Sequence, residues 1–328
     1  MSAEAHYEYR WEDHSLLTRY LNDPVFVPLV RVLPRRITPN MVTVFAHAIV
    51  WLTFLIALPR RELGALMFAA LGIAYITYAI LDCVDGMFAR YTQRTSRVGE
   101  LLDHGFDAIT LPLVSLGIGI ALSMPSWLVL GSTVAVAFMV FATFVHGYRV
   151  GYVVLGGIGS LEGIVAAGLI CLAVSFLGAD RFATPMFLGL SIASWLAIAI
   201  VGGSFLALLS MRGLIGYSGD FAALGLLCAA ITVWYSLGRI SIATTGLLFV
   251  AVCAYQVCIL TCARLLRAPL QLWDVALLVL MLGGVSLSVG LGLDASVQTT
   301  VAAIVLAYVL VRGGRRFAHA IGALRATG

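Results

Sequence analysis

Long apolar stretches recur along almost the whole chain, and they restrict the folds that it can adopt. A helix needs about 20 apolar residues to cross a bilayer, because each residue advances it by only about 1.5 Å. Of the 328 residues, 61% are hydrophobic and 11% are charged, whereas soluble domains carry about 25% charged residues. The mean hydropathy is +1.02. The sequence therefore predicts an all-α polytopic membrane protein.

About ten stretches are long enough to be transmembrane helices. We expect the sixth to tilt or break at Gly202-Gly203, and the tenth to be short. The predicted spans are residues 41–59, 64–82, 99–123, 127–148, 160–178, 184–211, 219–237, 241–263, 270–293 and 297–312.

The first forty residues differ from the rest. Residues 7–38 mix apolar and charged side chains without a spanning run, which predicts an amphipathic helix at the membrane interface. A solvated lead-in is the alternative. No early apolar segment suggests a cleavable signal peptide. We divide the chain into an N-terminal segment (1–40), a block of six predicted spans (41–211), and additional helices with a C-terminal tail (212–328).

The arginines predict the orientation. All twenty basic residues are arginines. With the N-terminus in the cytoplasm, sixteen of them fall on the cytoplasmic side and four on the other, as the positive-inside rule requires. The absence of lysine fits a GC-rich genome, so we expect the inner membrane of a bacterium.

Four carboxylates gather where the second and third spans adjoin. Asp82 and Asp85 end one span, and Asp103 and Asp107 begin the next. On helices, both spacings put a pair on one face, and the polar loop between lets the pairs face each other. Crowded carboxylates need a compensating charge, and hard oxygen ligands favour Mg²⁺, Ca²⁺ or Mn²⁺ over zinc. The spacing predicts a site for two divalent cations, which can stabilise a phosphoryl displacement.

Residues between the acids suit a phosphate-bearing ligand. Gly86 and Gly99 let the backbone approach it closely, and Arg90 offers a planar fork to phosphate oxygens. The skeleton of residues 82–107 resembles the signature of the CDP-alcohol phosphotransferase family, Asp-x2-Asp-Gly-x2-Ala-Arg-x8-Gly-x3-Asp-x3-Asp. Residues 37–40 and 99–107 resemble the choline/ethanolamine phosphotransferase branch of that family.

The resemblance implies that the six helices of residues 41–211 form a catalytic core around a polar chamber that opens to the cytoplasm. It implies that two divalent cations, Mg²⁺ or alternatively Mn²⁺, bind the diphosphate of the CDP-alcohol. Their ligands would be the four acids Asp82, Asp85, Asp103 and Asp107. The residues around the CDP moiety would be Asn40, Gly86, Ala89, Arg90 and Gly99.

The resemblance also links Glu100 and His104 to deprotonation of a lipid hydroxyl. The two are four residues apart, so the carboxylate can orient the imidazole and raise its basicity. A histidine with a pKa near 6.5 suits a general base at neutral pH. Two alternatives stay open: Asp107 as the base, and His104 as a packing residue.

We therefore expect an enzyme that transfers phosphocholine or phosphoethanolamine from a CDP-alcohol to a lipid hydroxyl such as that of diacylglycerol, releasing CMP. A homodimer is possible, and no nucleic-acid-binding motif is present. One alternative is a phosphatidyltransferase that uses CDP-diacylglycerol and a soluble alcohol. For a phosphorylated acceptor it would need a second arginine cluster facing the chamber, for which Arg149 is the only candidate. An ion-coupled transporter is disfavoured, because its acids would lie in broken helices near the midplane.

Several other polar or aromatic residues could have either a functional or a structural role. Tyr75 and Tyr78 could line an aromatic cage for a quaternary ammonium, but packing is the favoured interpretation. His47 is expected to be a satisfied interior histidine. Glu162 could be functional or simply begin a helix, and Asp220 and Asp274 are expected to cap helices. These last two expectations rest on their places near the starts of predicted spans.

Overall fold

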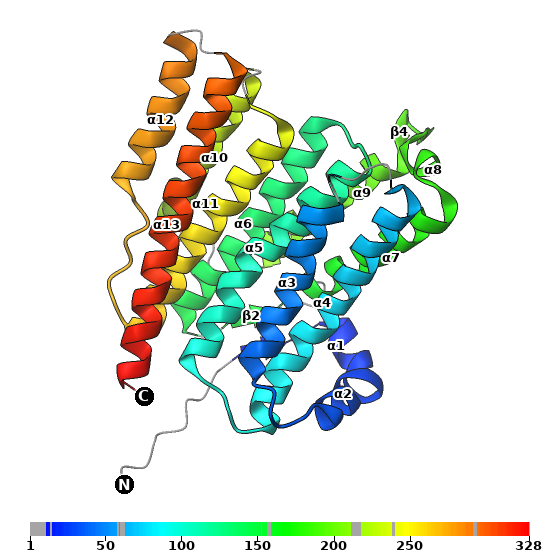
Figure 1. The fold of residues 1–328 in the computed structure, drawn as a ribbon, viewed down its shortest axis with the longest axis vertical. Coiled ribbons are helices and arrows are strands. Elements are labelled where there is room, and N and C mark those ends of the chain that lie inside the picture. Colours follow the sequence, from blue (N-terminus) through cyan, green and yellow to red (C-terminus); the bar gives the residue numbers. More distant parts are fainter. Residues whose placement is uncertain are drawn as a thin grey trace.

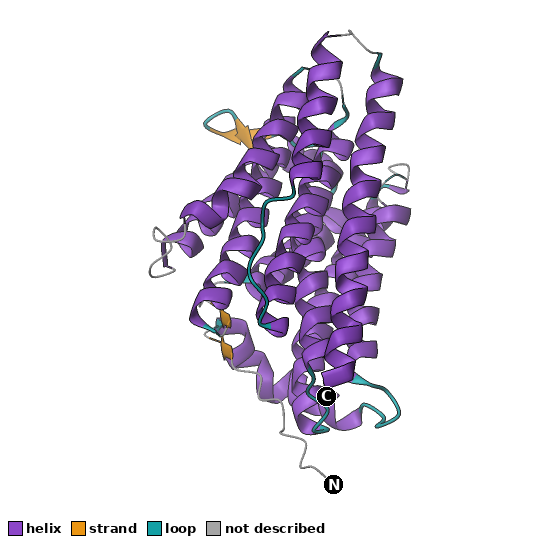
Figure 2. Ribbon diagram, turned by 90° about the vertical axis from the view of Figure 1, so that its left-hand side faces the viewer, coloured by secondary structure: helices purple, strands orange, loops and turns teal. Residues whose placement is uncertain are grey.

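The computed structural model describes residues 11–13, 15–57, 59, 63–151, 153–155, 159–210, 218–237, 240–290 and 294–327. Long helices run roughly side by side in one bundle, with short strands near its ends (Figures 1 and 2). Within the described residues, nine helices are long and apolar enough to cross a membrane, which confirms the all-α polytopic fold class. They are α3 (Pro39–Ala57), α4 (Ala65–Tyr91), α5 (Arg97–Ala121), α6 (Ser126–Val150), α7 (Ser160–Leu177), α9 (Ile192–Ser210), α10 (Ser218–Ser236), α11 (Ile242–Leu266) and α13 (Ala295–Thr327).

The ninth predicted span is shorter than expected. Its helix, α12 (Val275–Gly290), has 16 residues and starts at 275 rather than 270. Asp274 accepts a hydrogen bond of 3.1 Å from the Leu277 amide and so caps the helix, as predicted. Residues 268–274, which precede it, form an extended connection that follows α11 (Figure 1). A hydropathy window cannot separate such an apolar connection from a helix.

The tenth predicted span was expected to be short, and this is wrong. Helix α13 has 33 residues. The apolar window ends near Arg312, but the helix continues because its last turns also bury an apolar face. Phe317, Ala320 and Leu324 belong to a small hydrophobic cluster with Leu101 of α5.

The sixth span is also corrected. Its helix starts at Ile192, since residues 185–191 form the antiparallel strands β3 (Pro185–Phe187) and β4 (Leu190–Ser191), preceded by the short α8 (Ala179–Ala183). Helix α9 continues through Gly202-Gly203 without a break.

The N-terminal segment is helical but broken. It consists of α1 (Leu16–Leu21), the π-helical turn η1 (Asn22–Phe26) and α2 (Val27–Val32). Pro24 and Pro28 lack backbone donors, which prevents one regular helix. Phe26 is fully buried, whereas Tyr20 and Val32 are 70% and 74% exposed. This division into buried and exposed apolar faces suits a segment at the membrane interface.

Two contacts fasten this segment to the bundle. Strand β1 (Trp11–Asp13) pairs in parallel with β2 (Val153–Leu155). The Ser15 hydroxyl and the Leu17 amide donate hydrogen bonds of 2.6 and 3.1 Å to Glu162, at the start of α7. Glu162 also accepts a 2.8 Å bond from the Gly159 amide. These hydrogen bonds give Glu162 a structural role, which is to hold the N-terminal segment against α7.

The core consists of two large apolar clusters that meet at α5 and α6. One lies mainly among α3, α4, α5 and α7, and the other among α6, α10, α11, α12 and α13. Helices α4 and α7 meet backbone to backbone, because a Cβ on Gly72 would lie 2.8 Å from the carbonyl oxygen of Gly168. Close packing through small residues is common between membrane helices. The catalytic-core boundaries at 41 and 211 remain a prediction.

Candidate active site

The loop between α4 and α5 sets the direction of the two acid-bearing helices. The Arg94 amide donates a 2.8 Å hydrogen bond to the Ala89 carbonyl, and Gln93 adopts a left-handed φ of 55°. The Ser96 side chain then accepts a 3.0 Å bond from the Gly99 amide and caps α5. The chain thus reverses within a few residues, and α3 packs against both helices.

Three of the four predicted acids come together, and a histidine joins them. His47 of α3, Asp82 of α4, and Asp103 and Asp107 of α5 each place one ligand atom within 4.8 Å of the others. We call these four residues the acid–histidine group. His47 is fully buried, whereas the three acids are half-buried.

Two atoms of this group lack hydrogen-bond partners. Within the described residues, neither Asp82 Oδ1 nor His47 Nε2 is hydrogen-bonded, although both atoms are buried. Leaving a buried polar atom unsatisfied costs on the order of 1–3 kcal/mol. A divalent cation would satisfy both, and three carboxylates with one imidazole form a reasonable donor set for Mg²⁺ or Mn²⁺. The residues therefore fit a metal ion.

Asp85 lies apart from the acid–histidine group. Its carboxylate accepts a 2.5 Å hydrogen bond from the hydroxyl of Thr43 on α3, and it is 5% exposed. It nevertheless lines the same small cavity as Asp103. Asp85 therefore borders this cavity together with Asp103, a member of the group.

Tyr78 and Thr110 orient members of the group. The Tyr78 hydroxyl donates a 2.5 Å hydrogen bond to Asp107, and its ring centroid lies 4.9 Å from that of His47. His47 Nδ1 lies 2.7 Å from the Thr110 hydroxyl, which also accepts a 2.8 Å bond from Trp51. His47 is thus satisfied on one nitrogen only, which corrects the expectation of a satisfied interior histidine. Tyr78 is more than a packing residue, because its hydroxyl contacts an acid of the group.

The small cavity gathers the residues predicted to surround CDP. Its volume is about 70 Å³, well below the range of about 300–1,000 Å³ typical of ligand pockets. A side chain at Gly99 would be crowded here, because a Cβ would lie 3.0 Å from the side-chain oxygen of Asn40. Besides Asp85, Asp103 and Glu100, the lining includes all five predicted residues, Asn40, Gly86, Ala89, Arg90 and Gly99.

Glu100 and His104 lie as predicted on one face of α5, but a third residue joins them. His104 Nδ1 is 3.9 Å from the Glu100 carboxylate, too far for a hydrogen bond. Arg264 of α11 forms an ion pair with Glu100, and its guanidinium is 3.4 Å from His104 Nδ1. Both Glu100 and His104 are buried. Glu100 therefore neutralises Arg264 rather than orienting the imidazole by a direct bond.

The remaining sequence candidates lie elsewhere. Arg149 pairs with Asp220 at 2.6 Å, so it is engaged by an acid at the start of α10. The prediction that Asp220 only caps its helix misses this pair. Tyr75 is fully buried and contacts the α5 backbone near Gly117.

The sequence contains a signal for some of the residues that were missed. Asn40, Thr43 and His47 follow an i, i+3, i+7 pattern on α3, and Tyr78 lies one turn before Asp82. Both patterns place polar groups on the face that carries the site. No local pattern indicates Arg264, because it comes from a distant helix.

Comparison with known proteins places this site in a family context. The family model for CDP-alcohol phosphatidyltransferase matches residues 36–211, more than half of the chain. Choline/ethanolaminephosphotransferase 1 of Arabidopsis thaliana is 31% identical over 118 residues, which is 34% of this chain and 30% of the relative.

Two animal proteins named cholinephosphotransferase 1 match longer segments. The protein of Rattus norvegicus is 31% identical over 161 residues, 46% of this chain and 40% of the relative. That of Gallus gallus is 31% identical over 182 residues, 52% of this chain and 53% of the relative. The chain therefore matches only 30% to 53% of the length of these three relatives.

Proposed function

We propose, from the premise that this chain belongs to the CDP-alcohol phosphatidyltransferase family, that it transfers a phosphoalcohol from a CDP-alcohol to a lipid hydroxyl. Phosphocholine or phosphoethanolamine is the group moved, diacylglycerol is the acceptor, and CMP is released. The relatives named choline/ethanolamine phosphotransferases support this choice. The observation that carries the proposal is the acid–histidine group beside a cavity lined by the predicted CDP residues.

The acids would hold the divalent cations. Asp82, Asp103 and Asp107 are the ligands that the geometry supports directly, and Asp85 lines the small cavity together with Asp103. His47 would add a nitrogen donor, which Mn²⁺ accepts more readily than Mg²⁺. When bound, such cations neutralise the diphosphate and stabilise the charge that develops on the leaving group.

The chain's own residues would bind the donor. Arg90 is exposed at the mouth of the cavity and offers paired N–H donors to phosphate oxygens. Gly86 and Gly99 line the cavity without side chains, so the backbone of α4 and of the start of α5 can approach the ligand closely. Because the cavity is small, the cytidine would extend beyond it, toward the polar loop.

His104 would remove the proton of the lipid hydroxyl, with Asp107 as the competing base. Glu100 makes this role compatible with the nearby Arg264, because it neutralises the guanidinium that would otherwise oppose protonation of the imidazole. The hydroxyl then attacks the phosphorus next to the alcohol, and the bond to CMP breaks. No covalent intermediate with the protein is needed.

The arginine asymmetry supports a cytoplasmic location for the site. The acid-bearing ends of α4 and α5 lie at the end of the bundle where the C-terminus lies (Figure 1), and the sequence puts most arginines on that side. A bacterial inner membrane and a homodimer remain predictions from the sequence; the three relatives described above come from a plant and two animals.

A donor panel tests the function. Purified protein with Mg²⁺ and diacylglycerol should convert labelled CDP-choline or CDP-ethanolamine into a labelled lipid and CMP. The Asp82→Asn variant, purified in the same way, serves as the control for contaminating activity. Product with CDP-diacylglycerol and a soluble alcohol, but with neither CDP-alcohol, would instead identify a phosphatidyltransferase. If no donor gives a product and the protein instead drives cation-dependent uptake of a solute into vesicles, the alternative of an ion-coupled transporter would be favoured.

A further inference from the structure

A second cavity lies between α11, α13 and the extended connection, outside the candidate active site. Its volume is about 410 Å³, within the range of small-molecule sites. The side formed by α11 and the connection is largely apolar, with Ile259, Ala263, Leu266 and Pro269. The lining therefore offers an acyl chain or another apolar group a place to pack.

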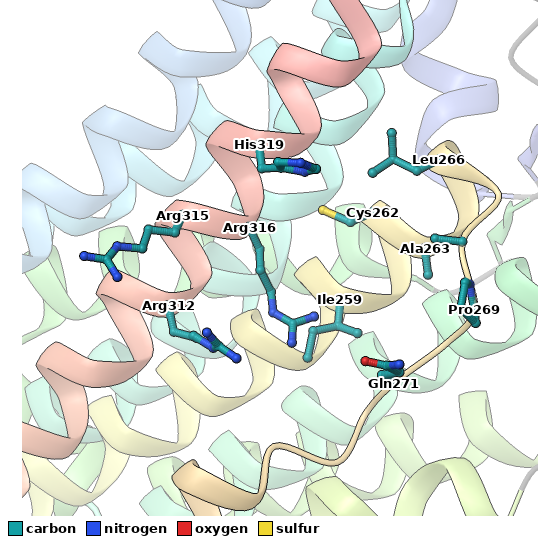
Figure 3. Close-up of a pocket in the computed structure, with 11 residues that line it drawn as sticks. Ile259, Cys262, Ala263, Leu266, Pro269, Gln271, Arg312, Arg315, Arg316 and His319 are labelled. Atoms are coloured by element: carbon teal, nitrogen blue, oxygen red, sulfur yellow. The ribbon is translucent and has the colours of Figure 1, made fainter.

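The α13 side of the cavity is strongly basic. Figure 3 shows Arg316 extending toward Ile259 and His319 pointing toward Cys262. Arg312 and Arg315 also line the cavity, although the guanidinium of Arg315 extends away from α11 in Figure 3. A cavity with one basic and one apolar wall is suited to an amphiphilic anion.

Two of these arginines have no acidic partner in the described part of the chain. Arg312 lies 3.5 Å from Asp274, whose carboxylate also accepts hydrogen bonds from Tyr255 and Tyr308. No carboxylate of the described residues pairs with Arg315 or Arg316. The Arg316 guanidinium instead lies 5.8 Å from the ring centroid of Tyr255. The cavity therefore carries an excess of positive charge.

The depth of the cavity indicates where its ligand comes from. Helix α13 has 33 residues, so it is about 50 Å long, whereas the hydrocarbon core of a bilayer is about 30 Å thick. Arg312 to His319 lie in the last third to half of this helix. Counted from the opposite membrane surface, they fall near the level of the lipid headgroups.

The extended connection adds polar groups at this level. Backbone outside a helix is tolerated at membrane depth only where it is buried in protein or lines a polar cavity. The side-chain amide of Gln256 donates a 3.1 Å hydrogen bond to the Leu272 carbonyl, which satisfies part of this backbone. Gln271 lines the cavity and can donate to an anion.

We propose that this cavity binds the phosphate of an anionic phospholipid, with Arg316 on the phosphate and the α11 wall against the first part of an acyl chain. Basic pockets between membrane helices are suited to anionic headgroups. A nucleotide would leave the apolar wall unused. The proposal is independent of the reaction proposed above, because it concerns only binding to α11 and α13.

Binding to the purified full-length protein tests the proposal. Native mass spectrometry would compare phosphatidylglycerol with phosphatidylcholine of the same acyl chains. We expect phosphatidylglycerol to bind more tightly, and the Arg316→Gln variant to bind it about fivefold more weakly, the loss expected for one arginine at a membrane surface. The matched control is Arg325→Gln, which removes an exposed arginine of the same helix outside the cavity. Equal weakening in both variants would overturn the proposal.

Cys262 provides a second measurement that needs no variant. It is half-buried and lines the cavity, so a bound lipid should slow its reaction with N-ethylmaleimide. The reaction would be followed in vesicles of phosphatidylcholine with and without phosphatidylglycerol, with the half-buried Cys83 as the internal reference. Slower modification of Cys262 alone supports the lipid. Protection by inorganic phosphate in pure phosphatidylcholine vesicles, without protection by phosphatidylglycerol, would identify a free anion and reject the lipid.

Discussion

The guanidinium of Arg264 on α11 forms an ion pair with the carboxylate of Glu100 on α5, next to His104. The two side chains are 15% and 5% exposed, so the pair is largely buried. It connects the helices that follow the family-matched region 36–211 to the candidate active site. The additional helices are therefore part of the site's surroundings.

The first prediction concerns this pair. Arg264→Gln should lower the free energy of unfolding by about 3–5 kcal/mol, because it leaves Glu100 buried without its cation. Adding Glu100→Gln should recover part of the loss, since the orphaned charge is then gone. Thermal unfolding in detergent measures both. The exposed pair between Arg149 and Asp220 is the control: Arg149→Gln should cost no more than about 1 kcal/mol. Similar losses in the two single variants would contradict the assignment.

The second prediction concerns metal binding. Asp82→Asn should abolish turnover and weaken Mn²⁺ binding, because it removes a charged ligand from the acid–histidine group. Electron paramagnetic resonance of free Mn²⁺ measures the affinity directly. Asp220→Asn removes an acid outside the group and should leave Mn²⁺ binding unchanged. Chelation should stop turnover of the unmodified protein, and added Mg²⁺ should restore it. Full activity of Asp82→Asn would rule out the ligand role.

His47 leads to a third prediction, on metal preference. If Nδ1 donates to Thr110, the lone pair of Nε2 is available to a cation. His47→Asn should then lower the affinity for Mn²⁺ by at least about tenfold and that for Mg²⁺ less, because nitrogen donors favour the softer ion. The ratio of the two affinities is the readout. His319→Asn, on α13 and outside the group, is the control; an unchanged ratio in His47→Asn would show that the imidazole is not a ligand.

Local periodicity explains how much of this site could be predicted. The spacing of Asp82, Asp103 and Asp107 follows helical geometry, so their convergence could be expected from the sequence. His47 and Arg264 come from other helices, and their positions depend on how α3 and α11 pack against α5. The start of α12 could not be predicted either, because the preceding connection is as apolar as a helix. Hydropathy reports depth in a membrane, not backbone conformation.

The fourth prediction separates the two candidate bases. His104→Ala should lower kcat by at least about 100-fold, the usual contribution of a general base, and leave Mn²⁺ binding intact, because His104 lies outside the acid–histidine group. Asp107→Asn should impair both turnover and Mn²⁺ binding. A loss of less than tenfold in His104→Ala would assign the role of base to Asp107.

The fifth prediction concerns the packing of α4, which carries Asp82 and Asp85. A Cβ on Gly168 of α7 would lie 2.6 Å from a side-chain carbon of Ile76 and 3.1 Å from the Gly72 carbonyl oxygen. Gly168→Ala should therefore cost about 1–3 kcal/mol in stability, as overpacking does.

Gly163 lies on the same helix, and a Cβ there would meet nothing within 4 Å. Gly163→Ala should keep or raise the melting temperature, because alanine favours a helix by up to about 1 kcal/mol over glycine. The comparison holds the helix and the chemical change constant and varies only the contact with α4. Equal shifts in both variants would mean that the backbones of α4 and α7 are not in contact at Gly72 and Gly168. A loss confined to Gly168→Ala, accompanied by weaker Mn²⁺ binding, would show that this contact also sets the position of the acids.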